Sequence, residues 1–178
     1  MGFSDSWMSM GDFGQNWRDA VGLSATYMRS DDKRKKHTVE ELLYTRRLER
    51  WNTKDSQANL WFIGGIGSLQ GDDNNGHDNI GNKLMLTLSV QFDYETTRVY
   101  LQGTARLYRA ESINHNFLSA RTGYDKTQPW FVLEARHMEG LSDKVEITPM
   151  LQLVNKRFFI EAGLNNAHDP RFNFMYLF

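Results

Sequence analysis

The stretch RFNFMYLF, residues Arg171 to Phe178, closes the chain and decides how the rest of it is interpreted. Aromatic side chains occupy every second position of this stretch, at Phe172, Phe174, Tyr176 and Phe178. Successive side chains of a β-strand point to opposite faces, so one face of a strand here is wholly aromatic. The ends of water-soluble domains are usually polar and frayed. The stretch therefore indicates a strand whose aromatic face meets lipid, with an edge strand of a soluble sandwich as the alternative.

Composition limits the class of protein. The chain has 178 residues, 24% of them charged, a net charge of −1 and no Cys. This length suits one domain, and the charge gives no reason to expect a nucleic-acid partner. The absence of Cys excludes thiol catalysis and Cys metal sites. The mean hydropathy is −0.60, and no apolar run is long enough for a spanning helix. A membrane barrel is still allowed, because its strands are apolar only at alternate positions.

Alternation of apolar and polar residues is clearest in the runs 84–95 and 98–108, which a tight turn at Thr96-Thr97 joins into a hairpin. The run 38–51 also fits a helix, since Thr38 and Glu41 have capping-box spacing, but its neighbours need a strand as partner. Pro149 is expected to mark a bulge. The predicted strands number ten: 20–28, 38–51, 58–68, 84–95, 98–108, 118–124, 130–138, 145–153, 158–164 and 171–178.

The connections between these strands sort by length. Short turns, near 52–57, 96–97, 125–128 and 155–156, fall at one end, and loops, near 30–37, 69–82, 111–115, 139–144 and 166–170, fall at the other. This asymmetry is typical of membrane barrels. We therefore expect an all-β, transmembrane, antiparallel up-and-down β-barrel of about ten strands over 19–178, preceded by an arm or short strand over 1–18. Eight or twelve strands, and a soluble barrel that binds an apolar ligand, are the alternatives.

The polar faces of these strands are expected to line the lumen. Acidic Asp93 and Glu95 fall opposite basic Arg98 and Arg106 on the next strand, which suits a salt-bridged interior. A barrel of about ten strands leaves little room inside, and mixed charges argue against strong ion selectivity. A packed interior is therefore favoured over an open pore or a binding cavity. The expected lumen-lining residues are Gln91, Asp93, Glu95, Arg98, Tyr100, Gln102, Arg106, Arg121, Glu134, Arg136, Glu146, Gln152 and Glu161.

Candidate chemistry is sparse. Met8, Met10, His115 and His137 are weak metal-ligand candidates, because thioether and imidazole groups suit copper. No HExxH, GxSxG or phosphate-binding glycine loop is present. We expect no enzyme and no cofactor. The alternative, a rim-active enzyme on lipid or peptide, predicts that the outer loops bring His115 or His168 onto Ser112 or a carboxylate.

Two parts of the chain resemble known groups of proteins. The terminal alternation resembles the closing strand of bacterial outer-membrane β-barrels, which the barrel-assembly machinery reads, so the assembly signal would be Phe172, Phe174, Tyr176 and Phe178. YMRSDD (27–32) and TQPWFVLEARHMEGLSDKVEITP (127–149) resemble a set of uncharacterised bacterial envelope proteins that accompany copper-resistance genes. These resemblances imply an outer-membrane location, lipid and the assembly machinery as partners, and a link to copper tolerance. They imply a narrow channel or a structural or binding barrel, and no catalytic residue.

Overall fold

Alternating residues fold into one antiparallel sheet in the computed structural model, which describes residues 2–10, 18–30, 32–73, 78–111, 113–124, 129–155 and 158–176, with the backbone alone for 2–10, 78, 175 and 176. The strands are β1 (Gly2–Met10), β2 (Asp19–Arg29), β3 (Lys36–Asn52), β4 (Ser56–Asp73), β5 (Asp78–Asn79), β6 (Lys83–Thr96), β7 (Val99–Ala110), β8 (Ile113–Tyr124), β9 (Trp130–Glu139), β10 (Glu146–Asn155), β11 (Phe158–Leu164) and β12 (Pro170–Tyr176).

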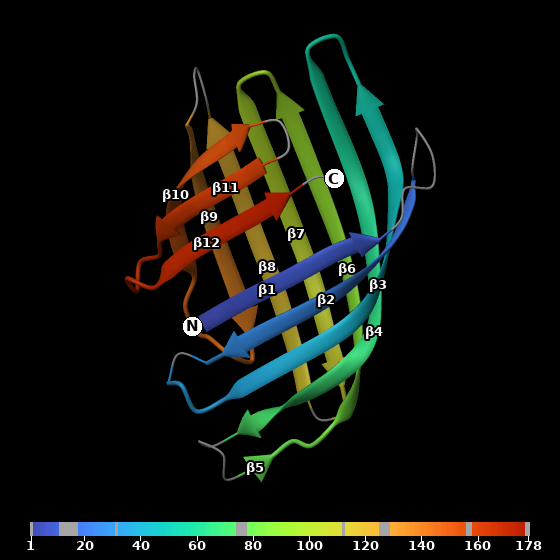
Figure 1. The fold of residues 1–178 in the computed structure, drawn as a ribbon, viewed down its shortest axis with the longest axis vertical. Coiled ribbons are helices and arrows are strands. Elements are labelled where there is room, and N and C mark those ends of the chain that lie inside the picture. Colours follow the sequence, from blue (N-terminus) through green and yellow to red (C-terminus); the bar gives the residue numbers. More distant parts are fainter. Residues whose placement is uncertain are drawn as a thin grey trace.

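Each strand pairs with the next one along the chain, except that β4 pairs with β6 and the two-residue β5 pairs only with β4. Figure 1 shows the result, a single strongly curled sheet in which the strands run up and down in sequence order. β1 and β12 form its two edges, and no pairing joins these edges among the described residues. The sheet therefore has the form of a half-barrel.

The ten predicted strands are all present, as β2 to β4 and β6 to β12, and the all-β up-and-down fold is confirmed. The run 38–51 is a strand, because β3 pairs along its length with both β2 and β4. β1 and β5 are additional strands. The expected loop at 111–115 is wrong in extent, since β8 already begins at Ile113.

The expected bulge at Pro149 is also wrong. Pro149 pairs with Leu133 of β9 without a shift of register, and the ladder with β11 begins only at Met150. The missing amide of Pro149 therefore interrupts no hydrogen bond of that ladder. A register shift lies instead between Arg47 and Glu49, where β3 pairs with β4.

The two faces of the sheet differ in chemistry. Apolar side chains point outward from the convex face, and mostly polar ones point into the concave face. In β6, Leu84 is 64% exposed while the next residue, Met85, is 0% exposed. The exposed apolar residues of the convex face include Leu23, Leu42, Ile66, Leu86, Leu88, Val90, Leu101, Leu107, Leu118, Phe131, Leu133, Ile147, Leu151, Ile160 and Phe172.

We name the two ends of the sheet by their connections. The turn end carries 53–55, 97–98, 125–129 and 156–157, as well as the longer β1–β2 connection, and the loop end carries 30–35, 74–82, 111–112, 140–145 and 165–169. At the loop end, buried apolar residues from β2 to β9 and from the loop after β9 fill the concave side. This apolar plug consists of Met28, Val39, Leu69, Met85, Tyr108, Ile113, Met138 and Leu141.

Candidate functional site

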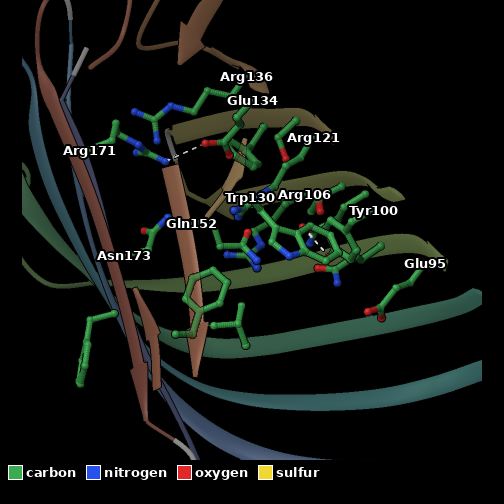
Figure 2. Close-up of a pocket in the computed structure, with 18 residues that line it drawn as sticks. Glu95, Tyr100, Arg106, Arg121, Trp130, Glu134, Arg136, Gln152, Arg171 and Asn173 are labelled. Carbon is green, nitrogen blue, oxygen red and sulfur yellow. Dashed lines mark hydrogen bonds and ion pairs between the residues drawn. The ribbon is translucent and has the colours of Figure 1, made fainter. Parts of the chain in front are cut away.

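A cavity of about 770 Å³, lined by polar and aromatic side chains, occupies the concave face beyond the apolar plug. Figure 2 shows its side chains converging from several strands on one space. The strands β6 to β12 supply its lining, which combines four arginines with amides and aromatic rings. The lining residues are Gln91, Glu95, Tyr100, Gln102, Thr104, Arg106, Phe117, Ser119, Arg121, Trp130, Glu134, Arg136, Gln152, Val154, Phe159, Arg171, Asn173 and Phe174.

Ion pairs hold three of the four arginines. Arg136 of β9 binds Glu146, its register partner on β10. The other two pairs cross the concave face between strands that are not neighbours. Arg121 of β8 binds Glu161 of β11. Arg171 of β12 lies 3.2 Å from Glu134 of β9, from Nη2 to Oε2.

Hydrogen bonds satisfy the carboxylates of these pairs further. Asn173 donates to Glu161 at 2.6 Å, and Asn165 donates to Glu146 at 3.2 Å. A buried charge is tolerated when it is paired and hydrogen-bonded in this way. The fourth arginine, Arg106, donates to the hydroxyl of Tyr108 at 3.1 Å and lies over that ring. The cationic groups of the cavity are therefore bound to the protein itself.

Nine of the thirteen residues expected in the lumen line this cavity: Gln91, Glu95, Tyr100, Gln102, Arg106, Arg121, Glu134, Arg136 and Gln152. Glu146 and Glu161 lie buried behind it as partners of its arginines. Among the described residues, no arginine forms an ion pair with Asp93. Asp93 accepts hydrogen bonds from Asn59 Nδ2 at 2.7 Å and from Trp61 Nε1 at 2.6 Å.

Arg98 is the exception among these residues. It is exposed in the β6–β7 turn, where the Thr96 hydroxyl accepts hydrogen bonds from the amides of Arg98 and Val99 at 3.2 and 2.9 Å. Placing the turn at Thr96-Thr97 assigned Arg98 to the strand. Arg98 belongs to the turn, because β6 extends to Thr96 and β7 begins only at Val99. The expected pairing of Arg98 with acidic residues of β6 is therefore wrong.

Sequence reasoning missed several lining residues, among them Thr104, Ser119, Trp130, Arg171 and Asn173. Arg171 and Asn173 alternate with the aromatic residues of the closing strand, so the period-two pattern could have placed them on the inner face. Their partners could not be found in this way. Glu134 and Glu161 are 37 and 12 residues away from them along the chain.

A second polar group, the histidine pair, lies inside the loop end. His37 Nδ1 and His115 Nε2 are 3.1 Å apart, and His37 Nε2 is 3.1 Å from Asp73 Oδ1. The two side chains are 1% and 4% exposed. His37 is on β3 and His115 is on β8, so the pair joins strands that are separated by β4, β6 and β7.

The ring geometry identifies this contact as a hydrogen bond. The ring centroids are 5.3 Å apart and the planes differ by 24°, so the rings meet nearly edge to edge and in line. A proton on one nitrogen then points at the lone pair of the other. Nδ1 of His115 faces the turn at Gly140, where an added Cβ would lie 2.5 Å from it. One bridging proton therefore joins the two rings. The absence of a side chain at Gly140 leaves space for the ring of His115.

Burial lowers the pKa of both imidazoles. For His115, desolvation and then the neighbouring His37 lower the pKa to about 4. For His37, desolvation lowers the pKa and the Asp73 carboxylate partly opposes that shift. Both residues lie beyond the convex apolar residues of their strands, which begin at Leu42 and Leu118.

The metal-ligand candidates do not assemble. His115 is bonded to His37, and His137 Nδ1 lies 3.2 Å from the Lys144 carbonyl. The side chains of Met8 and Met10 lie outside the described part of the structure. Within the described residues, no group of three or more His, Cys, Asp or Glu side chains could hold a metal ion.

The rim-enzyme alternative requires His115 or His168 beside Ser112 or a carboxylate, and Ser112 lies outside the described residues. His115 reaches the carboxylate of Asp73 only through His37, and both rings are buried away from any substrate. His168 is exposed in the β11–β12 loop, and its backbone amide donates to Asn165 O at 2.9 Å. Within the described residues, no hydrogen bond joins the ring of His115 or His168 to a side-chain hydroxyl.

No protein-family model matches the chain, and no curated protein and no solved structure is significantly similar to it. The described residues contain no helix of the length and hydrophobicity needed to cross a membrane.

Proposed function

We propose that the chain is a small outer-membrane β-barrel whose role is structural or ligand-binding. One observation carries the proposal: large apolar side chains are exposed on the convex face of every strand from β2 to β12 except the two-residue β5. Contiguous exposed apolar surface of this extent marks a lipid or protein contact. A soluble barrel around an apolar ligand has the reverse polarity, with polar residues outside.

The polar interior agrees with a membrane barrel, whose lumen-facing side chains are polar. Membrane strands must also leave no unpaired edge in lipid, so the proposal requires that β1 and β12 find partners there. Outer-membrane lipid and the barrel-assembly machinery are the partners it implies. The exposed Phe172 and Phe174 of β12 are half of the expected assembly signal, and the side chains of Tyr176 and Phe178 are outside the described set.

A binding or structural role is favoured over a channel. The apolar plug and the histidine pair fill the concave side at the loop end. The charges of the cavity alternate in sign and are paired, unlike the single-sign rings of selective pores. We therefore expect low conductance across a bilayer.

A link to copper tolerance stays a prediction from sequence resemblance. Its test is a Cu(I) titration of the folded chain, read from the imidazole resonances in NMR spectra. Selective shifts of His115 or His137 at stoichiometric copper would support the link. Unchanged resonances would leave the chain without a metal role.

Membrane insertion is tested by one substitution on the convex face with a matched control. Leu88→Arg places a charge in the middle of β6 and is expected to destabilise the inserted chain by about 2–4 kcal/mol. Leu48→Arg, near the turn end of β3 and beside Arg47, is expected to cost under ~1 kcal/mol. Heat-dependent electrophoretic mobility and urea unfolding in vesicles measure both. Equal effects, or a chain that stays folded in plain buffer, would contradict the proposal.

A further inference from the structure

The cavity offers uncharged polar groups, although many charged residues surround it. Its four arginines are matched by four glutamates that line it or bind its arginines, Glu95, Glu134, Glu146 and Glu161. Since Arg121, Arg136 and Arg171 are each paired with a carboxylate, their charge is already neutralised within the protein, and an anionic ligand would lie beside those carboxylates. A ligand that carries no net charge meets no such cost.

Neutral hydrogen-bonding groups lie side by side across the cavity. Gln91 pairs in register with Thr104, and Thr104 pairs with Ser119, so an amide and two hydroxyls form a row over β6, β7 and β8. Gln152 of β10 adds another amide. None of the described residues hydrogen-bonds the side-chain amides of Gln91 and Gln152. An amide offers two donors and an acceptor, which suits a ligand with several hydroxyl groups.

Aromatic rings lie beside these groups. Tyr100 of β7 is the register partner of Gly123, and an added Cβ at Gly123 would lie 3.4 Å from the Trp130 ring. Because Gly123 has no side chain, it leaves a shallow depression between Tyr100 and Trp130. Figure 2 shows both rings at the cavity. Trp130 is also the direct register partner of Gln152. A ring and an amide are thus presented together on neighbouring strands.

We propose that this cavity binds a neutral saccharide. A pyranose ring has a face of C–H groups, which packs on an aromatic ring, and an edge of hydroxyls, which amide and hydroxyl side chains bind. The cavity volume lies in the range of small-molecule sites. The inference rests on the ligand-binding form of the proposed function, and it names the chemical class of the ligand.

The test uses the full chain, folded in a detergent without a sugar headgroup, such as an alkyl dimethylamine oxide. The probes are maltotriose, cellotriose and diacetylchitobiose, with glucuronate and inorganic phosphate as anionic comparators. Titration calorimetry is expected to show binding of at least one neutral probe and of neither anion. Raising the salt from about 0.05 to 0.5 M is expected to leave the affinity within about twofold, because the ligand carries no charge to screen.

Two variants locate the site. Trp130→Ala is expected to weaken binding about tenfold, and Gln152→Leu several-fold, since each removes one ligand contact. Trp51→Ala is the matched control, because Trp51 is exposed on β3, packs on the exposed Phe92 and does not line the cavity. Retained heat-dependent mobility shows that each variant is folded.

The outcomes separate this proposal from membrane insertion. A chain that inserts into vesicles but binds none of the neutral probes overturns the saccharide site and leaves the barrel in place. Binding of phosphate or glucuronate alone, or binding that Trp130→Ala leaves unchanged, also overturns it. A chain that binds a neutral probe but fails to insert would support the site and contradict the membrane role.

Discussion

The imidazole of His115 links acid pH to stability at the loop end. Its pKa is lowered from 6.5 to about 4 in the folded chain, so the unfolded chain binds the proton more tightly. Stability from this group is therefore complete above about pH 6.5 and is lost as the pH falls toward 4. The full shift corresponds to a loss on the order of 3 kcal/mol. Urea unfolding of the folded chain between pH 7 and pH 4 measures it.

Charged groups around the histidine pair also act on its protonation, so the test compares two histidine variants. Asp73 and Lys35 act on both rings through their charges, and Arg109 donates to the backbone carbonyl of His115 at 3.1 Å. His115→Gln is expected to flatten the stability profile between pH 4 and 6.5. His168→Gln, at an exposed loop position, is expected to leave it unchanged. A profile that His115→Gln does not alter would remove the pair as its cause.

Gly65 of β4 leaves room for a contact across the concave face. Glu41 of β3 passes over it to accept a hydrogen bond from Thr87 of β6. An added Cβ at Gly65 would lie 2.7 Å from Leu43 Cδ2 and 3.0 Å from Glu41 Oε1. Gly65→Ala is therefore expected to destabilise the chain by about 1–3 kcal/mol, as overpacking does.

Gly103 of β7 is the matched control for that substitution. An added Cβ there meets nothing within 4 Å. Gly103→Ala is expected to be neutral or to stabilise by up to ~1 kcal/mol, through the entropy of the unfolded chain. Urea midpoints of the two variants give the comparison. Equal midpoints would mean that Glu41 does not need the space at Gly65.

Among the elements, β8 and β11 are tied across the concave face by Arg121 and Glu161. The carboxylate of Glu161 is 0% exposed, so removing its cation leaves a buried charge. Arg121→Leu is expected to cost about 3 kcal/mol, and the double variant with Glu161→Leu is expected to recover most of it. Arg34→Ala breaks an exposed pair with Asp32 and should cost under ~1 kcal/mol. A double variant as unstable as the single one would contradict this tie.

The strands could be predicted from sequence because one face of each is apolar, and period-two alternation records that directly. The ties between strands could not. Arg121 and Glu161 are 40 residues apart, and they meet only because the sheet curls across β9 and β10. His37 and His115 are 78 residues apart, and only the curl of the sheet brings them together. Pro149 likewise could not be interpreted from its own position. It causes no bulge because the ladder between β10 and β11 begins only at Met150.

For the whole molecule, the proposed function requires the edges of the sheet to be paired when the chain is in lipid. The described sheet has two edges, β1 and β12. Backbone N–H and C=O groups along a free edge bind water in solution, and in lipid each unsatisfied group costs several kcal/mol. β1 and β12 run parallel, because the order from one edge to the other holds eleven strands of alternating direction. Antiparallel closure would instead bring β12 to β2, whose edge β1 occupies.

Hydrogen exchange at β12 tests whether the membrane closes the sheet. If β12 pairs on both sides in lipid, its backbone amides that point away from β11 should be protected from water. They should then exchange at least tenfold more slowly in vesicles than the amides of the exposed turn at 97–98. β11, which is paired on both sides in the described sheet, gives the reference for full protection. Because the chain has no Cys, introduced Cys pairs between β12 and either β1 or β2 would then identify the partner strand. Exchange along β12 as fast as at the turn would mean an open edge, which excludes a spanning barrel and leaves the apolar face to a protein partner.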